Sequence, residues 1–181
     1  MPHDPNPIVT GVRRHDLPRT CTARTSPAGS GPGEAAFSAR IERHLADCRR
    51  LQQQLAVLAI RVDQVNTIDG QPAPGLEESV VLEFGHRLRS RVRATDSVLW
   101  LGGCEHGVVL LDCRPDGARA VEQRLNSALG GVYRIGTTLV NTTPAIGVAC
   151  HPAAGNTGSM LQAAAVDARH RAAVHGAASQ R

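Results

Sequence analysis

The chain has 181 residues, a formal net charge of +4 and a sequence pI of about 9.1. All 20 basic residues are arginine and only 2% of residues are aromatic, so the interleaved basic and aromatic side chains of a nucleic-acid-binding surface are missing. No apolar run reaches the length of a membrane span and there is no signal-peptide core, which predicts a cytoplasmic protein without a membrane partner. The five cysteines include no Cys-x-x-Cys pair and are expected as reduced thiols.

Residues 1–34 are rich in Pro, Gly, Ser and Thr and have no apolar periodicity. Such a segment buries too little apolar surface to offset the entropy of ordering, which predicts a flexible N-terminal tail. Residues 35–177 carry regular patterns and are expected to form one domain, and residues 178–181 are expected to form a short second tail.

Helix and strand patterns alternate within the expected domain. Apolar side chains at helical spacing (Phe37, Ile41, Leu45 and Cys48) predict a first helix, and the short continuous apolar run at 55–60 predicts a central strand covered on both faces. The expected order is a helix from residue 35, a strand at 55–60, a helix at 76–92, strands at 97–101 and 108–111, a helix at 117–128, strands near 132–140 and 144–150, and a helix at 159–175. This interleaving predicts an α+β fold in which helices cover one side of a sheet.

The segment Gly102-Gly103-Cys104-Glu105-His106, followed by an apolar run, resembles the Gly-Gly-Asp/Glu-Glu-Phe hairpin of GGDEF domains. Arg93-Ala94-Thr95-Asp96 precedes Gly102 with five residues in between, where that family has its RxxD motif. Residues 60–68 look like the family's first strand, Ile-Asp-Leu-Asp-x-Phe-Lys-x-Ile, and residues 145–148 look like its Ser-Ile-Gly-Ile strand. The resemblance covers roughly residues 37–177. It implies a nucleotidyl-cyclase-like sheet with a ferredoxin-like core, about five strands and flanking helices.

The resemblance also implies which residues have changed in the site where the family condenses two GTP molecules. That reaction needs divalent cations on the phosphates and carboxylates to hold them. Arg61 and Cys104 stand at the two metal-carboxylate positions, while Glu105 is kept and His106 replaces the usual Phe. The other positions of the former GTP site are Gly102, Gly103, Asp69 in place of an Asn, Glu78 in place of an Asp, and Ala173 in place of a phosphate-binding Lys. No catalysis, bound metal or cofactor is therefore expected.

The RxxD motif is an inhibitory site for cyclic di-GMP in many active members of the family. Arg93 and Asp96 keep its two named residues, and Arg124 stands where the family has a further Arg on the helix after the hairpin. Arginine can bind phosphate or a guanine edge, and Asp can accept guanine N–H groups. These three residues are the candidate cyclic di-GMP site, although Arg and Asp at a helix end are often simply solvated or paired.

Three interpretations remain open at this level. The first is a catalytically silent regulatory domain that acts through cyclic di-GMP, through another signalling protein or as a dimer. The second is a protein-interaction domain that binds no nucleotide, and the third is a residual cyclase or GTP-binding module that uses Glu105. We also expect Arg61 to replace the metal and to pair with Glu105 or Asp63 through a fork of two hydrogen bonds.

Overall fold

A sheet of five antiparallel strands, in the order β2-β3-β1-β5-β4, forms the centre of the molecule. The computed structural model describes residues 32–178, and every structural statement below concerns that range. Its elements in chain order are α1 (Pro32–Leu51), β1 (Leu55–Thr67), α2 (Glu77–Arg89), β2 (Ser97–Gly102), β3 (Glu105–Leu111), α3 (Pro115–Leu129), β4 (Gly131–Ile135), β5 (Thr138–Cys150) and α4 (Gly158–Ala178). The predicted α+β fold is confirmed.

The apolar run of β1 lies in the middle of the sheet, as its continuous hydrophobicity predicts. Leu55–Ile60 is buried on both faces, because each face of the sheet carries its own hydrophobic core. Leu58 and Ile60 pack with α2 and α3, whereas Val57 and Ala59 pack with α1 and α4. Successive side chains of a strand point to opposite faces, so both faces of β1 must be apolar.

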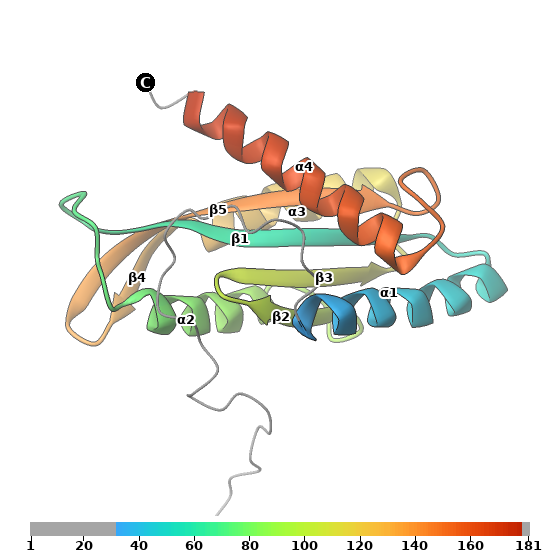
Figure 1. The fold of residues 1–181 in the computed structure, drawn as a ribbon, viewed down its shortest axis with the longest axis horizontal. Coiled ribbons are helices and arrows are strands. Elements are labelled where there is room, and N and C mark those ends of the chain that lie inside the picture. Colours follow the sequence, from blue (N-terminus) through green and yellow to red (C-terminus); the bar gives the residue numbers. More distant parts are fainter. Residues whose placement is uncertain (1–31, 179–181) are drawn as a thin grey trace, which may run out of the picture.

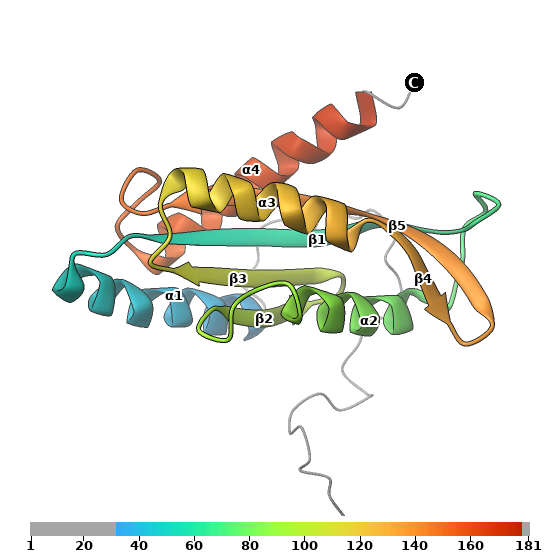
Figure 2. The same ribbon diagram turned by 180° about the vertical axis from the view of Figure 1, so that it is seen from behind.

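Two helices cover each face of the sheet, and the prediction that helices cover only one side is wrong. Figure 1 shows α1 and α4 on the near face, and Figure 2 shows α2 and α3 on the opposite face. Amphipathic spacing identifies the buried stripe of a helix but carries no information about which face of the sheet that stripe meets. No helix within residues 32–178 combines the length and the apolar character needed to cross a bilayer.

Several element boundaries differ from the sequence-based expectation, and β1 in particular continues past residue 60 to Thr67. The expected strand near 132–140 is interrupted at Gly136, whose φ of 59° forms a tight turn, so that β4 ends at Ile135 and β5 begins at Thr138. Strand β3 begins directly after the hairpin turn, at Glu105. Helix α1 begins at Pro32, so the last three residues of the predicted tail are helical. Residues 1–31 and 179–181, where the rest of the predicted tails fall, lie outside the described residues.

Candidate functional site

Strand pairing brings Arg61 and Glu105 together at one end of the sheet. The two residues are direct partners in the antiparallel register of β1 and β3. Asp63 lies two residues further along β1, at an irregularity in the pairing of β1 with β5, and its carboxylate still reaches Arg61. The Arg61 Nη1 atom is 4.0 Å from Glu105 Oε1, and the Arg61 Nε atom is 3.5 Å from Asp63 Oδ1. The predicted ion pairing of Arg61 with these carboxylates is confirmed.

The closest cation to Glu105 is a different arginine, supplied by α4. Arg169 Nη1 lies 3.1 Å from Glu105 Oε1, and the Arg169 side chain is only 4% exposed. Helix α4 can approach the sheet this closely because β5 has Gly147 at the contact. A Cβ atom at Gly147 would lie 2.0 Å from the backbone nitrogen of Arg169 and 2.2 Å from the carbonyl oxygen of Ala165. The glycine thus allows α4 to pack directly on β5, which places the Arg169 guanidinium beside the Glu105 carboxylate.

The predicted hydrogen-bond fork from Arg61 is wrong. Its guanidinium is split between two carboxylates at ion-pair distances, and its buried Nε has no hydrogen-bond partner. The shorter contact belongs to Arg169, which the sequence analysis missed. The signal was present, because Leu161, Ala165 and Arg169 follow one another at intervals of four on the sheet-facing stripe of α4, and the first two are fully buried.

The electrostatics of this cluster are those of a self-neutralised group rather than a cation site. Two guanidiniums, from Arg61 and Arg169, face two carboxylates, from Asp63 and Glu105. Burial raises the pKa of the Asp63 carboxyl, an effect that the Arg61 and Arg169 guanidiniums partly oppose. A divalent cation of the kind that the resemblance implies does not fit these residues. One guanidinium already occupies the carboxylate at 3.1 Å, and a second would repel the ion.

Cys104 and His106 lie on the other side of the sheet from this cluster. Both belong to the side-chain layer that faces α2 and α3, where Cys104 packs with the core and His106 lies 5.6 Å from Phe84 between ring centroids. Cys104 is disulfide-bonded, so the expectation of reduced thiols is wrong for this residue, whereas Cys48, Cys113 and Cys150 are free thiols. The two substituted metal positions, Arg61 and Cys104, therefore do not face a common point.

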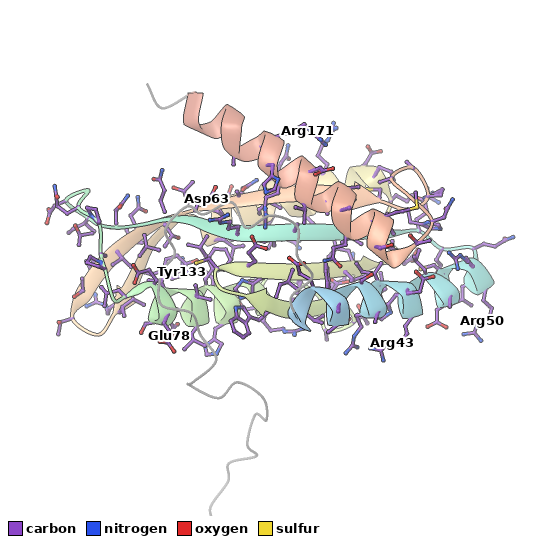
Figure 3. The ribbon with its side chains drawn as sticks, viewed as in Figure 1. Arg43, Arg50, Asp63, Glu78, Tyr133 and Arg171 are labelled. Atoms are coloured by element: carbon purple, nitrogen blue, oxygen red, sulfur yellow. The ribbon has the colours of Figure 1, made fainter. Side chains whose placement is uncertain are left out.

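The remaining positions that the resemblance assigns to a GTP site lie in four separate parts of the fold. Gly102 and Gly103 form the hairpin turn, with φ values of 119° and 51°. Asp69 is exposed in the turn after β1, and Ala173 is half-buried on α4. Glu78 lies in the first turn of α2 (Figure 3). None of these residues makes a side-chain hydrogen bond or ion pair with another of them among the described residues.

A separate cavity of about 330 Å³ lies at the opposite end of β3. Glu105 begins this strand and Leu111 ends it, so the cavity lies roughly 20 Å from the ion cluster at a rise of about 3.4 Å per residue. The cavity is lined by the end of α2, the following loop, the end of β3 and one face of α3. Arg93, Asp96 and Arg124 all line it, so the structure brings the three predicted ligand-binding residues together.

Asp96 has a structural role in this cavity. Its Oδ2 accepts a hydrogen bond of 2.9 Å from the backbone N–H of Arg93, and its Oδ1 accepts one of 3.3 Å from the N–H of Leu111. The side chain is 6% exposed and fixes the loop after α2 against β3. Arg124 Nη2 donates a hydrogen bond of 3.1 Å to the carbonyl oxygen of Arg91, which links α3 to the same loop. The loop that carries Arg93 is thus held from two sides.

Known proteins with similar sequences and folds identify the family. The family model described as "Diguanylate cyclase, GGDEF domain" matches residues 32–178. The diguanylate cyclase TpbB of Pseudomonas aeruginosa is 30% identical over 132 residues, which make up 72% of this chain and 30% of TpbB. This chain therefore spans less than a third of that relative.

Solved structures agree with the sequence match. The crystal structure of the GGDEF domain of TpbB superposes with a TM-score of 0.62 at 27% identity, covering 78% of this chain and 89% of that chain. A sensory box/GGDEF family protein from Caulobacter crescentus gives a TM-score of 0.66 at 22% identity, with 78% and 92% coverage. Since the family model spans most of the chain and the fold is that of solved members, the chain belongs to the GGDEF family of diguanylate cyclase domains.

Proposed function

We propose that this GGDEF domain is catalytically silent and acts as a regulatory domain that binds cyclic di-GMP through Arg93, Asp96 and Arg124. The observation that carries the proposal is a contrast between two regions of one strand. At one end of β3 the cluster around Glu105 is neutralised by guanidiniums, and at the other end the three RxxD-type residues line one cavity.

Catalytic silence is supported by the charge of the hairpin cluster. Condensation of GTP in this family depends on cations held by carboxylates, and those cations stabilise charge on the phosphates. Glu105 is paired with Arg169 at 3.1 Å, and Arg61 occupies the strand position opposite it. GTP and its cation would have to displace a side chain that is almost completely buried, which would leave Arg169 without its carboxylate partner.

Cyclic di-GMP binding is supported by the chemistry of the cavity. Arg93 and Arg124 can each donate two parallel hydrogen bonds to a phosphodiester or to the Hoogsteen edge of guanine. Asp96 already accepts one amide hydrogen bond on each oxygen, and a carboxylate has about four acceptor positions, so capacity for guanine N–H groups remains. A volume of about 330 Å³ is at the lower end for a small-molecule site, so part of a cyclic dinucleotide would stay outside.

Titration calorimetry with cyclic di-GMP and with GTP in the presence of Mg²⁺ tests the proposal. We expect binding of cyclic di-GMP and none of GTP, together with no cyclic di-GMP product by chromatography. Arg93→Ala should weaken cyclic di-GMP binding roughly tenfold or more, because it removes a charge-assisted hydrogen bond. Arg134→Ala, an exposed arginine on β4 outside the cavity, is the matched control.

Each alternative outcome has a distinct meaning. Product formation that Glu105→Ala abolishes would refute catalytic silence. Binding that Arg93→Ala leaves unchanged would refute the assignment of the site. Failure of both nucleotides to bind would favour the protein-interaction interpretation over the receptor.

A further inference from the structure

One face of α3 forms a wall of the cavity, with an arginine at each end. Arg114, Gly117, Val121 and Arg124 all line the cavity and follow one another at intervals of three, four and three residues, so they share a face of the helix. Gly117 and Val121 give the middle of this wall a small, apolar surface. Arg114 and Arg124 are separated by ten residues, about 15 Å along the helix axis.

Arg114 is at a helix position for which arginine is not among the preferred residues. It is the N-cap of α3, where Ser, Thr, Asp and Asn are preferred, and it makes no side-chain capping hydrogen bond. A cation at this end also opposes the positive pole of the helix dipole, at a cost of about 0.3–1 kcal/mol. A residue that breaks a local rule in this way is expected to serve a function elsewhere.

The arginines around the cavity have no acidic partners in the part of the chain that the structure describes. Arg91, Arg93, Arg114 and Arg124 all line the cavity, and none of them forms an ion pair within 4.0 Å with a carboxylate of residues 32–178. Two carboxylates line the same cavity: that of Asp96 is taken up by backbone N–H groups, and that of Asp112 forms no ion pair within 4.0 Å with these arginines. An anion bound here would offset both the clustered guanidiniums and the unfavourable charge at the α3 N-terminus.

We infer that Arg114 is a second anion-binding residue of this cavity, opposite Arg93 and Arg124, and that the ligand carries two phosphate groups. One phosphate would be bound by Arg93 and Arg124, and the other by Arg114 at the start of α3. This identification of the ligand rests on the proposed function: the two phosphate groups are the phosphodiesters of cyclic di-GMP. The apolar surface of Gly117 and Val121 lies between them.

Substitution of Arg114 by serine separates binding from stability. Serine is a preferred N-cap, so R114S is expected to keep or raise the thermal midpoint of the full chain. The same change should weaken cyclic di-GMP binding by about tenfold or more in calorimetry, because it removes a charged donor. Arg114→Gln and Arg119→Gln form a charge-matched pair on α3, because Arg119 is exposed and does not line the cavity. Only the first of the two should weaken binding.

The outcomes separate this inference from the proposed function. If Arg93→Ala weakens binding and R114S does not, the role of Arg114 is overturned while the receptor proposal stands. If the parent protein does not bind cyclic di-GMP, the same variants are titrated with inorganic pyrophosphate. Binding of pyrophosphate that depends on Arg114 would then support the second anion-binding residue and overturn the receptor proposal. Absence of binding, or binding independent of Arg114, would overturn both.

Discussion

His106 should make the stability of this domain depend on pH, because its imidazole is buried where it cannot easily be charged. The side chain is 4% exposed and faces α2, with Nε2 close to Gly85 and the ring beside Phe84. Its Nδ1 is buried without a hydrogen-bond partner. Burial lowers the pKa of His106 from 6.5 to about 4.

The sign and size of the effect follow from that shift. The unfolded chain takes up a proton at His106 near pH 6.5, whereas the folded chain does so only near pH 4. The stability that the neutral His106 allows is therefore fully present above pH 6.5. The free energy of unfolding falls as the pH is lowered from 6.5 to about 4. A difference of about 2.5 pH units corresponds to about 3 kcal/mol in the free energy of unfolding, of which about 2 kcal/mol should be lost by about pH 5.

The measurement is urea denaturation between about pH 7.5 and pH 4.5 on the parent chain and on His106→Phe, which carries the residue usual in the family. Burial raises the pKa values of the Asp63 and Glu122 carboxyls, so these groups also contribute to the pH dependence. Their contributions are common to both proteins and cancel in the difference. We expect the free energy of unfolding of the parent to fall relative to the variant by about 2 kcal/mol at about pH 5. A difference that stays constant over this range would refute the reasoning, whatever constant offset Phe repacking introduces.

Two substitutions test the packing that positions the sites. Gly147→Ala should lower the free energy of unfolding by about 3 kcal/mol or more in urea denaturation, because its Cβ would overlap the backbone of α4. Gly117→Ala is the control: its Cβ would make only an ordinary contact at 3.5 Å, so it should be neutral or slightly stabilising. Tyr133→Phe removes a buried hydroxyl that donates a 2.7 Å hydrogen bond to the Leu129 carbonyl, so we expect a loss of about 1 kcal/mol in the same assay, and an unchanged midpoint would show that this bond contributes nothing.

The hydrophobic pattern predicts the elements of this fold well but not how charged residues are used. The stripe from Phe37 to Cys48 and the run at 55–60 could be placed correctly, because burial alone decides such positions. The β4–β5 turn could not, because Gly136 lies among β-branched residues that read as one continuous strand. The contact of Arg169 with Glu105 could not be predicted either, because its position belongs to an apolar stripe while its charge suggests a solvated side chain.

Family spacing predicted which residues lie near one another better than it predicted their contacts. The RxxD-type residues could be found by spacing and do share a cavity. The pairing of Arg61 could also be predicted from opposite charges on facing strands, because strand register is fixed by the hydrophobic pattern. The contribution of α4 depends on how closely a helix backbone approaches Gly147, which is a tertiary property that no local pattern contains.

The pair formed by Arg169 and Glu105 should couple these two residues more strongly than a surface ion pair of similar length. A double-mutant cycle with Arg169→Leu and Glu105→Gln measures this coupling by urea denaturation near neutral pH. Breaking one side of a buried pair leaves an uncompensated charge, and because Glu105 is about a quarter exposed, we expect a coupling of about 1–3 kcal/mol.

The matched control is the pair of Arg50 and Asp47 on α1, which has a similar distance of 3.2 Å but side chains that are 75% and 64% exposed. Figure 3 shows where Arg50 lies on this helix. Its coupling should be about 0.5 kcal/mol or less, because solvent screens exposed pairs. A coupling between Arg169 and Glu105 no larger than that of the control would contradict the view that α4 supplies the cation of this cluster. Neutralisation of Glu105 and Asp63 would then depend on Arg61 alone, and Arg61→Asp by itself should give these carboxylates measurable Mg²⁺ affinity. If the coupling is large, Mg²⁺ affinity should appear only when Arg169→Leu accompanies Arg61→Asp, because both guanidiniums must leave before the carboxylates can bind a cation.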